Sequence, residues 1–384
     1  MAIVLVDRFN RMMAAAAALI AALVLPGPGQ PALAEQVVAQ AAARDPARIA
    51  QASNITVGLI AGDTGSTDAR IAADIATVVD DADRLRVLPI LGNGSVQNIA
   101  DLIYLKGVDV AIVHADALAQ TMQSNAIPKE GSVQYVAKLY QEEIHVLAGK
   151  GIADLNDLNG QPVNAGRPGS GTELTAATLF GALHVGASFR HETDTRALDL
   201  LRRGEIAAMV VVGGKPVPLL QTVPPGTGLH FLPIELNQQL VDTYLPISLE
   251  YQQYPSLVTM GHSVDTVAVG AVLITLATPA DSLRARRINR FVDTLFDRFD
   301  QFSEPGFHPK WSEVSLFAQV PGWTRYPEAQ TLVSKRDQSR EANLRSAFGT
   351  YLSQTGQSID GLDSARQQAL FQDFLRWRGK RAGP

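Results

Sequence analysis

Cysteine is absent from the sequence. Without a thiol the chain forms no disulfide bond, carries no cysteine nucleophile and offers no cysteine for lipid attachment at a processing site. Charged residues are also scarce, at 18% of the chain, and the formal net charge is −5. This balance gives no electrostatic reason to expect nucleic acid or an anionic membrane surface as a partner.

Apolar residues are abundant, at 46% of the 384 residues, which is enough to bury the core of one or two globular domains. An apolar run at 12–25 follows Arg8 and Arg11 and precedes the small-residue motif Ala32-Leu33-Ala34. This pattern is typical of a secretory signal peptide, here 1–34, that is cleaved after Ala34. We therefore expect a periplasmic protein that is not a lipoprotein. The alternative is a membrane anchor, which needs a longer run of about 20 residues.

Strands alternate with helices through the first part of the chain. Strands are predicted at 55–60, 86–91 and 108–113, and the polar or glycine-rich loops after them are 62–67, 92–95 and 114–116. Such alternation favours a parallel α/β sheet that is covered on both faces. In these sheets ligands collect where loops leave the carboxyl ends of strands. The three loops are therefore expected to line one edge of a cleft.

The chain is expected to form two doubly wound α/β lobes. Further strands are predicted at 162–165, 207–212 and 263–275, and a helix with Ile288, Phe291, Val292, Leu295 and Phe296 on one face follows the last of them. After a flexible lead-in at 35–54, the first lobe is predicted at 55–145 plus 264–327 and the second at 146–263, with two crossovers between them. Residues 328–384 are predicted to form a helical extension that docks onto the body.

The segment 155–183 combines a short strand, a glycine-rich turn at 166–171 and a helix. The first turn of such a helix leaves backbone N–H groups without partners and directs the positive end of its dipole outward. It therefore favours an anion, such as a carboxylate or phosphate. A purely structural alternative stays open, because Ser170 and Glu173 have the spacing of a capping box. A nucleotide phosphate loop is excluded, since Thr172 stands where that motif requires lysine.

Several short motifs, collinear along 55–327, carry a resemblance to a known family. They are ITVGLIAGDTGS from Ile55, GNGSVQN from Gly92, VDVAIVHAD from Val108, LYQE from Leu139, NAGRPGSGT from Asn164, VGG from Val212 and VPGWTRY from Val320. The set resembles the TAXI family, the solute-binding subunits of tripartite ATP-independent periplasmic (TRAP) transporters.

The resemblance implies a bilobal type II periplasmic binding protein fold that holds a small anionic solute between its lobes. The solute would be an amino acid, an oxo acid or a dicarboxylate, delivered to membrane permease subunits that are driven by an ion gradient. The chain departs from the family's usual residues at several positions, so the identity of the ligand is not implied. These positions are Asp63, Asp68, His114, Arg167 and Val212.

The candidate ligand-binding residues are small or polar and lie in the predicted loops. They are Thr64, Gly65, Ser66, Asn93, Ser95, His114, Asp116, Arg167, Ser170, Gly171, Thr172 and Gly213. Arg167 is the foremost, because a planar guanidinium beside a helix N-terminus fits a carboxylate. A solvated arginine, or one ion-paired at the surface, is the alternative.

Other candidates also have two interpretations. His114 and Asp116 either bind a ligand ammonium or hydroxyl group or cap the next helix. Ser95 and Ser170 are predicted helix caps that can also donate to a ligand. Lys215 is a possible second positive charge, although lysines after a strand usually face solvent.

No catalytic residue, metal site or cofactor is predicted. The sequence contains no Gly-x-Ser-x-Gly motif, and its histidines lack the i, i+4 spacing of a helical zinc site. We therefore predict an extracytoplasmic solute-binding protein of a TRAP-type transporter rather than an enzyme. The alternatives are a ligand-sensing periplasmic module for a membrane signalling partner and the solute-binding protein of an ABC-type importer.

Overall fold

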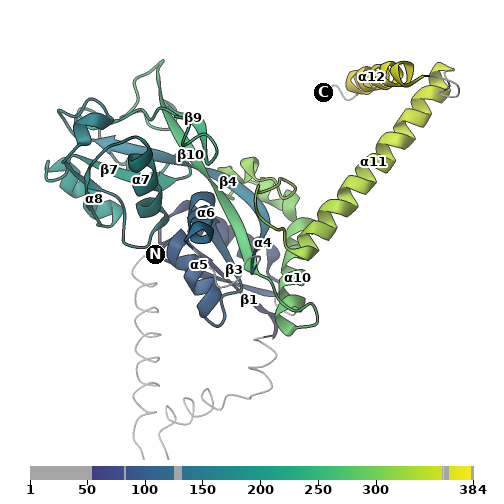
Figure 1. Ribbon diagram of the computed structural model, residues 1–384, viewed down its shortest axis with the longest axis horizontal. Helices are drawn as coiled ribbons and strands as arrows, with labels where there is room; N and C mark the ends of the chain where they lie inside the picture. Colours follow the sequence, from purple (N-terminus) through teal and green to yellow (C-terminus); the bar gives the residue numbers. More distant parts are fainter. Residues whose placement is uncertain (1–53, 82–83, 125–131, 357, 359–362, 382–384) are drawn as a thin grey trace, which may run out of the picture. The chain divides into compact units, whose positions relative to one another are not determined.

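The computed structural model describes residues 54–81, 84–124, 132–356, 358 and 363–381 (Figure 1). The predicted signal peptide at 1–34 and all but the last residue of the lead-in at 35–54 lie outside the described residues. Among those that are described, no helix has both the length and the apolar character needed to cross a membrane.

The elements alternate as the sequence predicts in the first part of the chain. The strands are β1 (Thr56–Ala61), β2 (Arg86–Leu91), β3 (Val110–His114), β4 (Val133–Ala148), β5 (Pro162–Asn164), β6 (Ser188–Arg190), β7 (Ala208–Gly213), β8 (His230–Phe231), β9 (Tyr244–Glu250) and β10 (Ser263–Leu276). The α-helices are α4 (Thr67–Val79), α5 (Ser95–Tyr104), α6 (Ala115–Gln123), α7 (Gly171–Ala182), α8 (Asp194–Arg202), α9 (Pro218–Gln221), α10 (Leu283–Asp297), α11 (Pro327–Thr355) and α12 (Ser364–Arg381). Short 3-10 helices are η1 (Leu155–Leu158), η2 (Phe299–Ser303) and η3 (Pro309–Glu313).

The strands form one 10-stranded sheet in the order β2-β1-β3-β10-β4-β7-β5-β6, with β8 beside β4 and β9 beside β10. The sheet as a whole is mixed, and the parallel pairing predicted for the first part of the chain is found in β1, β2 and β3. Strands β1, β2 and β3 are parallel, as are β5, β6 and β7. Strand β10 is antiparallel to β3, β4 and β9. It pairs with the preceding strand β9 as an antiparallel neighbour and so enters between β3 and β4 against their direction.

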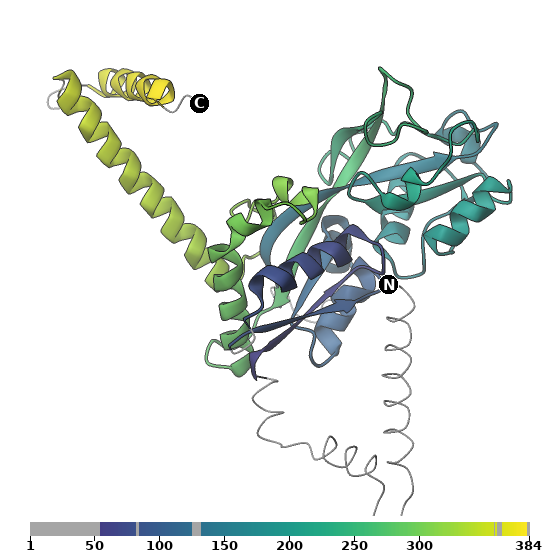
Figure 2. The ribbon, with the colours of Figure 1, turned by 180° about the vertical axis from the view of Figure 1, so that it is seen from behind.

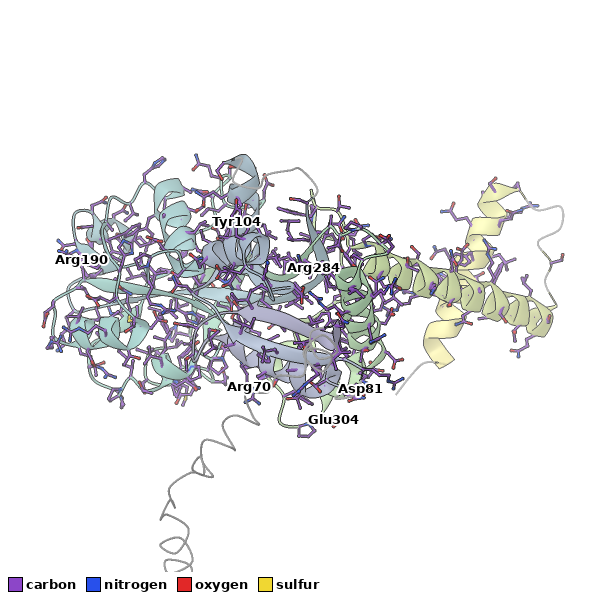
Figure 3. All side chains as sticks on the ribbon, turned by 90° about the horizontal axis from the view of Figure 1, so that it is seen from below. Arg70, Asp81, Tyr104, Arg190, Arg284 and Glu304 are labelled. Carbon is purple, nitrogen blue, oxygen red and sulfur yellow. The ribbon has the colours of Figure 1, made fainter. Side chains whose placement is uncertain are left out.

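Helices cover both faces of the β1–β3 region because its side chains alternate between two hydrophobic clusters. Leu59 packs in one cluster with the apolar faces of α4 and α10, whereas Ile60 packs in the other with α5 and α6. The opposite directions of successive side chains in a strand produce this division. Helices α4 and α10 are seen together from behind in Figure 2. On α10, Arg284 and Arg287 form ion pairs with the buried Asp109 at 3.1 and 2.7 Å. Arg284 is labelled in Figure 3.

Two long strands pass from one pair of hydrophobic clusters to another. On β4 the change falls between Tyr140 and Ile144, and on β10 it falls between Val269 and Ala271. The polar residues Glu142 and Glu143 therefore lie on β4 where one core ends and the next begins. These changes lie close to the lobe limits expected from the sequence, and the limits themselves stay a prediction.

The C-terminal helices pack differently from the body. The beginning of α11 joins the main core through Ala329, as the docking prediction requires. Farther along, α11 packs against α12, and Tyr351, Leu370 and Phe374 form a small cluster of their own. The expected docking thus describes the start of the extension, whereas its remainder is held by contacts between its two helices.

Candidate functional site

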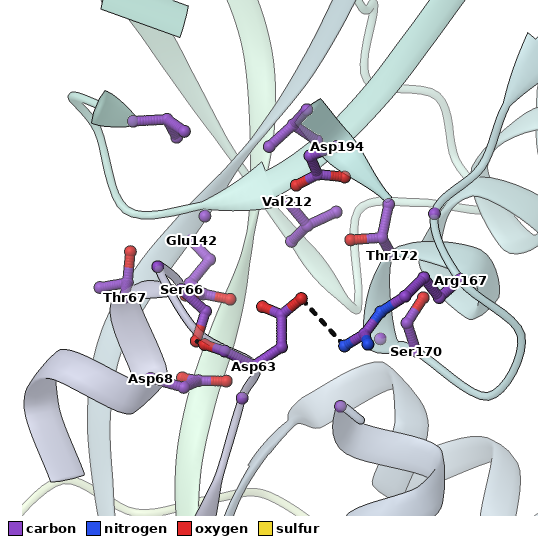
Figure 4. A pocket seen from close by; sticks show the side chains of 18 of the residues that line it. Asp63, Ser66, Thr67, Asp68, Glu142, Arg167, Ser170, Thr172, Asp194 and Val212 are labelled. Carbon is purple, nitrogen blue, oxygen red and sulfur yellow. Dashed lines mark hydrogen bonds and ion pairs between the residues drawn. The ribbon is translucent and has the colours of Figure 1, made fainter. Parts of the chain in front are cut away.

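A cavity of about 540 Å³ lies where the loop after β1 approaches the turn before α7 (Figure 4). Segments from both predicted lobes contribute to it. From the first come 62–68, 93–95, His114 and Glu142, and from the second come 166–167, 170–172, 193–195, 211–213 and 217–219. The cavity is therefore built from loops at the carboxyl ends of strands, as the α/β pattern predicts.

Besides the four-residue helix α9, four longer helices begin at this cavity, because Thr67, Ser95, Gly171 and Asp194 all belong to its lining and are the first residues of α4, α5, α7 and α8. Three of the helices have a side-chain cap at the preceding residue, supplied by Ser66, Ser170 and Thr193. Helix α5 follows Gly94 and has no side-chain cap. The converging positive dipole ends and first-turn N–H groups favour negative charge in the cavity.

The structure brings together all the candidate ligand-binding residues except one. Thr64, Gly65, Ser66, Asn93, Ser95, His114, Arg167, Ser170, Gly171, Thr172 and Gly213 line the cavity. Their contact with a ligand stays a prediction. Residues 62–67 and 92–95, expected to form one edge of a cleft, indeed lie beside the turn at 166–172, and Asn93 Nδ2 donates to the Pro168 carbonyl at 2.6 Å.

Asp116 is the exception, because its side chain turns away from the cavity into the protein. Its Oδ2 accepts hydrogen bonds from Thr175 Oγ1 at 2.6 Å and from the Tyr244 hydroxyl at 2.9 Å. Its other oxygen accepts from the backbone N–H of Ala117 at 2.7 Å. Asp116 is buried and joins α6 to α7 and β9, so its place among the ligand-binding residues is corrected to a structural one.

Arg167 lines the cavity but already has a partner. Its Nη2 lies 2.9 Å from Oδ2 of Asp63, and the Arg167 side chain is 33% exposed (Figure 4). The ion-paired alternative is therefore the arrangement in the structure. The pair joins the loop after β1 to the turn before α7. It uses Nη2 of Arg167, so other N–H groups of the guanidinium are available to a ligand. Lys215, in contrast, donates through Nζ to the Ser248 carbonyl at 2.6 Å and is not part of the lining.

The turn before α7 combines capping with a close approach to a buried histidine. Ser170 Oγ accepts from the N–H of Glu173 at 3.1 Å, and Glu173 Oε2 accepts from the N–H of Gly169 at 2.6 Å. A Cβ at Gly171 would stand 2.6 Å from Nδ1 of His114, so only glycine fits there. Ser95 does not cap its helix, since its Oγ accepts from the backbone N–H of His114 at 2.9 Å.

A buried cluster in the cavity lining consists of Asp68, His114 and Glu142. The three side chains offer polar atoms within 4.8 Å of one another. His114 Nε2 lies 2.5 Å from Oε2 of Glu142, and the Tyr140 hydroxyl donates to Oδ1 of Asp68. His114 Nδ1 is buried and has no hydrogen-bond partner among the described residues. The cluster has the donor types of a metal site, but a metal bound jointly by Nε2 and Glu142 would replace the bond between them and leave Nδ1 without the supporting hydrogen bond that usually orients a metal-binding histidine.

Charge interactions within the cluster change its titration. Burial alone would lower the pKa of His114, but the negative charges of Glu142 and Asp68 raise it to about 9. Burial and the charge of Asp68 raise the pKa of Glu142 to about 7, against the opposing effect of His114. Burial also raises the pKa of Asp68. Protonated His114 is therefore the one positive partner that the carboxyl groups of Asp68 and Glu142 share.

Another carboxyl group lines the cavity at the start of α8. Burial, followed by the negative charge of Asp63, raises the pKa of Asp194 to about 6, while Arg167 opposes the shift. The lining thus combines helix N-termini with both signs of side-chain charge. Its ionisable groups are Asp63, Asp68, Glu142, Asp194, His114 and Arg167. The site is therefore bipolar rather than simply positive.

Sequence reasoning missed all four of these carboxyl groups as site residues, although Asp63 and Asp68 were noted as departures from the family's usual residues. Asp68 has the position of an ordinary acidic residue in the first turn of a helix, and Asp194 does too. Glu142 gave a usable signal, since a pair of glutamates lies within a strand that is mostly apolar. A carboxylate in the middle of a buried strand requires a partner, and that partner is His114.

The second glutamate of that pair has a separate buried network. Glu143 Oε1 lies 2.7 Å from Nζ of Lys310, and Glu143 Oε2 accepts from the N–H of Lys215 at 2.7 Å. Burial raises the pKa of Glu143, and Lys310 opposes that shift. Because successive strand residues point to opposite faces, Glu142 serves the cavity and Glu143 joins β4 to η3 and to the segment after β7.

The sequence profile of the NMT1-like family matches residues 59–316 of the chain. This range contains every residue of the cavity lining. No curated protein sequence matches the chain. The family match and the sheet described above confirm the predicted fold class, the α/β fold of type II periplasmic binding proteins.

Solved structures whose backbones resemble this one include a transporter substrate-binding protein, an effector binding domain and a periplasmic domain. An amino acid ABC transporter substrate-binding protein from Streptococcus pneumoniae bound to L-arginine has 13% identity and a TM-score of 0.40, over 70% of this chain and 98% of that one. The effector binding domain of QuiR in complex with shikimate has 15% identity and a TM-score of 0.37, over 62% and 94%. The B. pertussis BvgS periplasmic domain has 12% identity and a TM-score of 0.39, over 78% and 48%. These low scores carry no argument about the ligand.

Proposed function

Because the chain belongs to the NMT1-like family, we propose that it is an extracytoplasmic solute-binding protein that captures a small carboxylate-bearing solute in the cavity described above. The proposal extends to a TAXI-type role, in which the loaded protein delivers its solute to the permease subunits of a TRAP transporter. It also places the mature protein in the periplasm after removal of residues 1–34. No catalytic step is part of the proposal.

One observation carries the carboxylate assignment: the first residues of the four longer helices α4, α5, α7 and α8 line one cavity. In the first turn of α7, the N–H groups of Gly171 and Thr172 have no partner among the described residues. Arg167 stands beside them with guanidinium donors beyond the one that meets Asp63. A carboxylate has two oxygens that accept such donors, and each charge-assisted bond is stronger than a neutral one.

A binding role also suits the hydroxyl groups of the cavity. Ser170 Oγ accepts from a backbone N–H as a helix cap, and Ser95 Oγ accepts from the N–H of His114. His114 Nε2 meets Glu142 rather than a serine. A serine nucleophile needs a base within hydrogen-bond reach, and neither serine has that pairing.

A thermal-shift screen of monocarboxylates, dicarboxylates, oxo acids and amino acids, with mass spectrometry of co-purified solutes, tests the binding role. A specific ligand at 100 times its Kd raises the free energy of unfolding by about 2.7 kcal/mol. A panel in which no carboxylate gives a shift and no solute co-purifies would refute the proposal. Uptake by vesicles containing the permease, driven by an ion gradient without ATP, tests the transport role.

Arg167→Ala tests the cation in the site. Loss of a charge-assisted hydrogen bond weakens carboxylate binding by about 1.5–3 kcal/mol, roughly tenfold or more. Stability should change by only about 0–1 kcal/mol, because the Asp63–Arg167 pair is partly exposed. Arg190→Ala is the matched control, since Arg190 is exposed on β6 and outside the lining (Figure 3). Equal affinities for the two variants would remove Arg167 from the binding site.

A further inference from the structure

We infer that the cluster of Asp68, His114 and Glu142 is a subsite for an ammonium group, so that the solute is a zwitterion with a protonated amine close to its carboxylate. The inference rests on the proposed binding function and deepens it, because it replaces a purely anionic solute by one of no net charge at this site. Three observations carry it: free acceptor atoms, the charge of the cluster and an unpartnered histidine nitrogen.

Each carboxyl group of the cluster has one oxygen in use and one available. Oδ1 of Asp68 accepts from the Tyr140 hydroxyl, and Oε2 of Glu142 pairs with His114 Nε2. Oδ2 of Asp68 and Oε1 of Glu142 have no hydrogen-bond partner among the described residues. Both side chains are buried yet line the cavity. An ammonium group has three N–H donors and no acceptor, which complements two carboxylate oxygens without disturbing the bonds already present.

The net charge of the cluster favours a ligand group that carries a single positive charge. When both carboxyl groups are ionised and His114 is protonated, the three side chains sum to one negative charge, and a bound ammonium group stabilises this form against the protonated carboxyl groups that burial favours. The positive end of the α4 dipole favours the ionised form of Asp68, which lies in the first turn of that helix. Asp63 and Arg167 neutralise each other. A monovalent ammonium therefore leaves the cluster neutral, whereas a divalent metal ion would overcompensate it and would have to replace the bond between His114 and Glu142.

The unpartnered Nδ1 of His114 supplies the independent observation. The His114 side chain is buried, with 4% of the residue exposed, and Nδ1 has no partner among the described residues. When protonated, Nδ1 is a donor beside Gly171, where the first turn of α7 offers free N–H groups. The Nδ1 side of the imidazole ring therefore suits a carboxylate oxygen of the solute. The Nε2 side lies beside Glu142, whose Oε1 can accept from the ammonium group. The two ligand groups should therefore be close neighbours, as in an amino acid.

Matched pairs of probes that differ by one amine test the inference on the full chain. The pairs are L-alanine with propionate, L-glutamate with glutarate, and L-2-aminobutyrate with butyrate, measured by calorimetry at neutral pH. At least one amine-bearing member should bind tenfold or more tightly than its partner, since a hydrogen bond to a charged group has about that effect. Asp68→Asn and Glu142→Gln should each reduce the preference about tenfold, because the amide offers a weaker acceptor.

Asp109→Asn is the control, since Asp109 is as buried as the cluster but pairs with Arg284 and Arg287 outside the cavity. It should keep the wild-type preference. The comparison of probes on the wild-type protein decides the matter even where a variant fails to fold. Equal or tighter binding of the amine-free members overturns the ammonium subsite and leaves the proposed function standing. Binding that is lost on chelation and restored by Mn²⁺ or Zn²⁺ also overturns it. Failure of every probe overturns the proposed function together with the inference.

Discussion

The buried ion pair between Lys310 and Glu143 provides a quantitative test of the structure. Lys310 Nζ contacts Glu143 at 2.7 Å and Glu313 at 2.8 Å, and its side chain is 2% exposed. Lys310→Met keeps most of the aliphatic side chain but removes the charge. Glu143 is then left fully buried, and among the residues that the structure describes its side chain keeps the N–H of Lys215 as its one remaining partner. Removing one member of a buried pair destabilises a protein by about 3–5 kcal/mol, which is the expected loss at pH 7.5.

The loss should depend on pH with a defined sign. Burial raises the pKa of Glu143 and Lys310 lowers it, so removal of Lys310 raises that pKa further. An acid whose pKa is higher in the folded than in the unfolded state destabilises the fold as pH rises between the two values. The difference between wild type and Lys310→Met should therefore shrink from pH 7.5 to pH 5 as folded Glu143 takes up a proton. Urea unfolding at the two pH values measures it.

Two further variants complete this test. The double variant Glu143→Gln/Lys310→Met removes the unpaired charge and should recover at least about half of the loss. Lys106→Met, at an exposed position, should change stability by no more than about 0.5 kcal/mol. A loss below about 1 kcal/mol for Lys310→Met, or a loss that grows as the pH falls, would refute the role given to this pair.

Three other outcomes follow from packing and titration. Gly171→Ala should destabilise by about 1–3 kcal/mol through overpacking and weaken solute binding, because its Cβ would meet an imidazole at 2.6 Å. In the same helix, Gly181→Ala has open space and should be neutral or stabilising by up to about 1 kcal/mol in thermal unfolding. Burial lowers the pKa of His145 to about 4, so the wild type should lose on the order of 3 kcal/mol between pH 6.5 and 4. His145→Gln should flatten that pH profile, and an unchanged slope would contradict the assignment. Phe374→Ala should leave the main thermal transition unchanged while speeding limited proteolysis of 364–381, since Phe374 belongs to the small cluster formed with Tyr351 and Leu370; a lowered main transition would show that the cluster supports the body.

The spacing of apolar residues predicted helices and strands well where it clearly follows either the helical period or the strand period. Strand β2 occupies 86–91 as expected, and α10 buries Ile288, Phe291, Val292 and Leu295 on the predicted face. The start of α7 was predictable because Ser170 and Glu173 mark a helix N-terminus. These features depend on neighbours within a few residues, which a single sequence contains.

Pairing between distant segments could not be obtained in this way. Strand β10 inserts between β3 and β4 through contacts with residues more than a hundred positions away, and its apolar run suits a parallel or an antiparallel neighbour equally. The partner of Arg167 is Asp63, 104 residues earlier. The prediction left an ion pair open but had no means to choose its second member. Asp116 was misplaced for the same reason, because Tyr244, which holds it, lies 128 residues later.

The arrangement of Glu142 and Glu143 restricts how this protein can evolve. The two residues project from opposite faces of β4, one toward the cavity and one toward Lys310. Inserting or deleting a single residue earlier in β4 would exchange the two faces. It would move one carboxylate away from His114 and withdraw the other from its lysine in the same event. Changes of solute preference should therefore arise by substitutions and by length variation in the loops at 62–66 and 166–170. The length of β4 should stay constant among descendants that still fold.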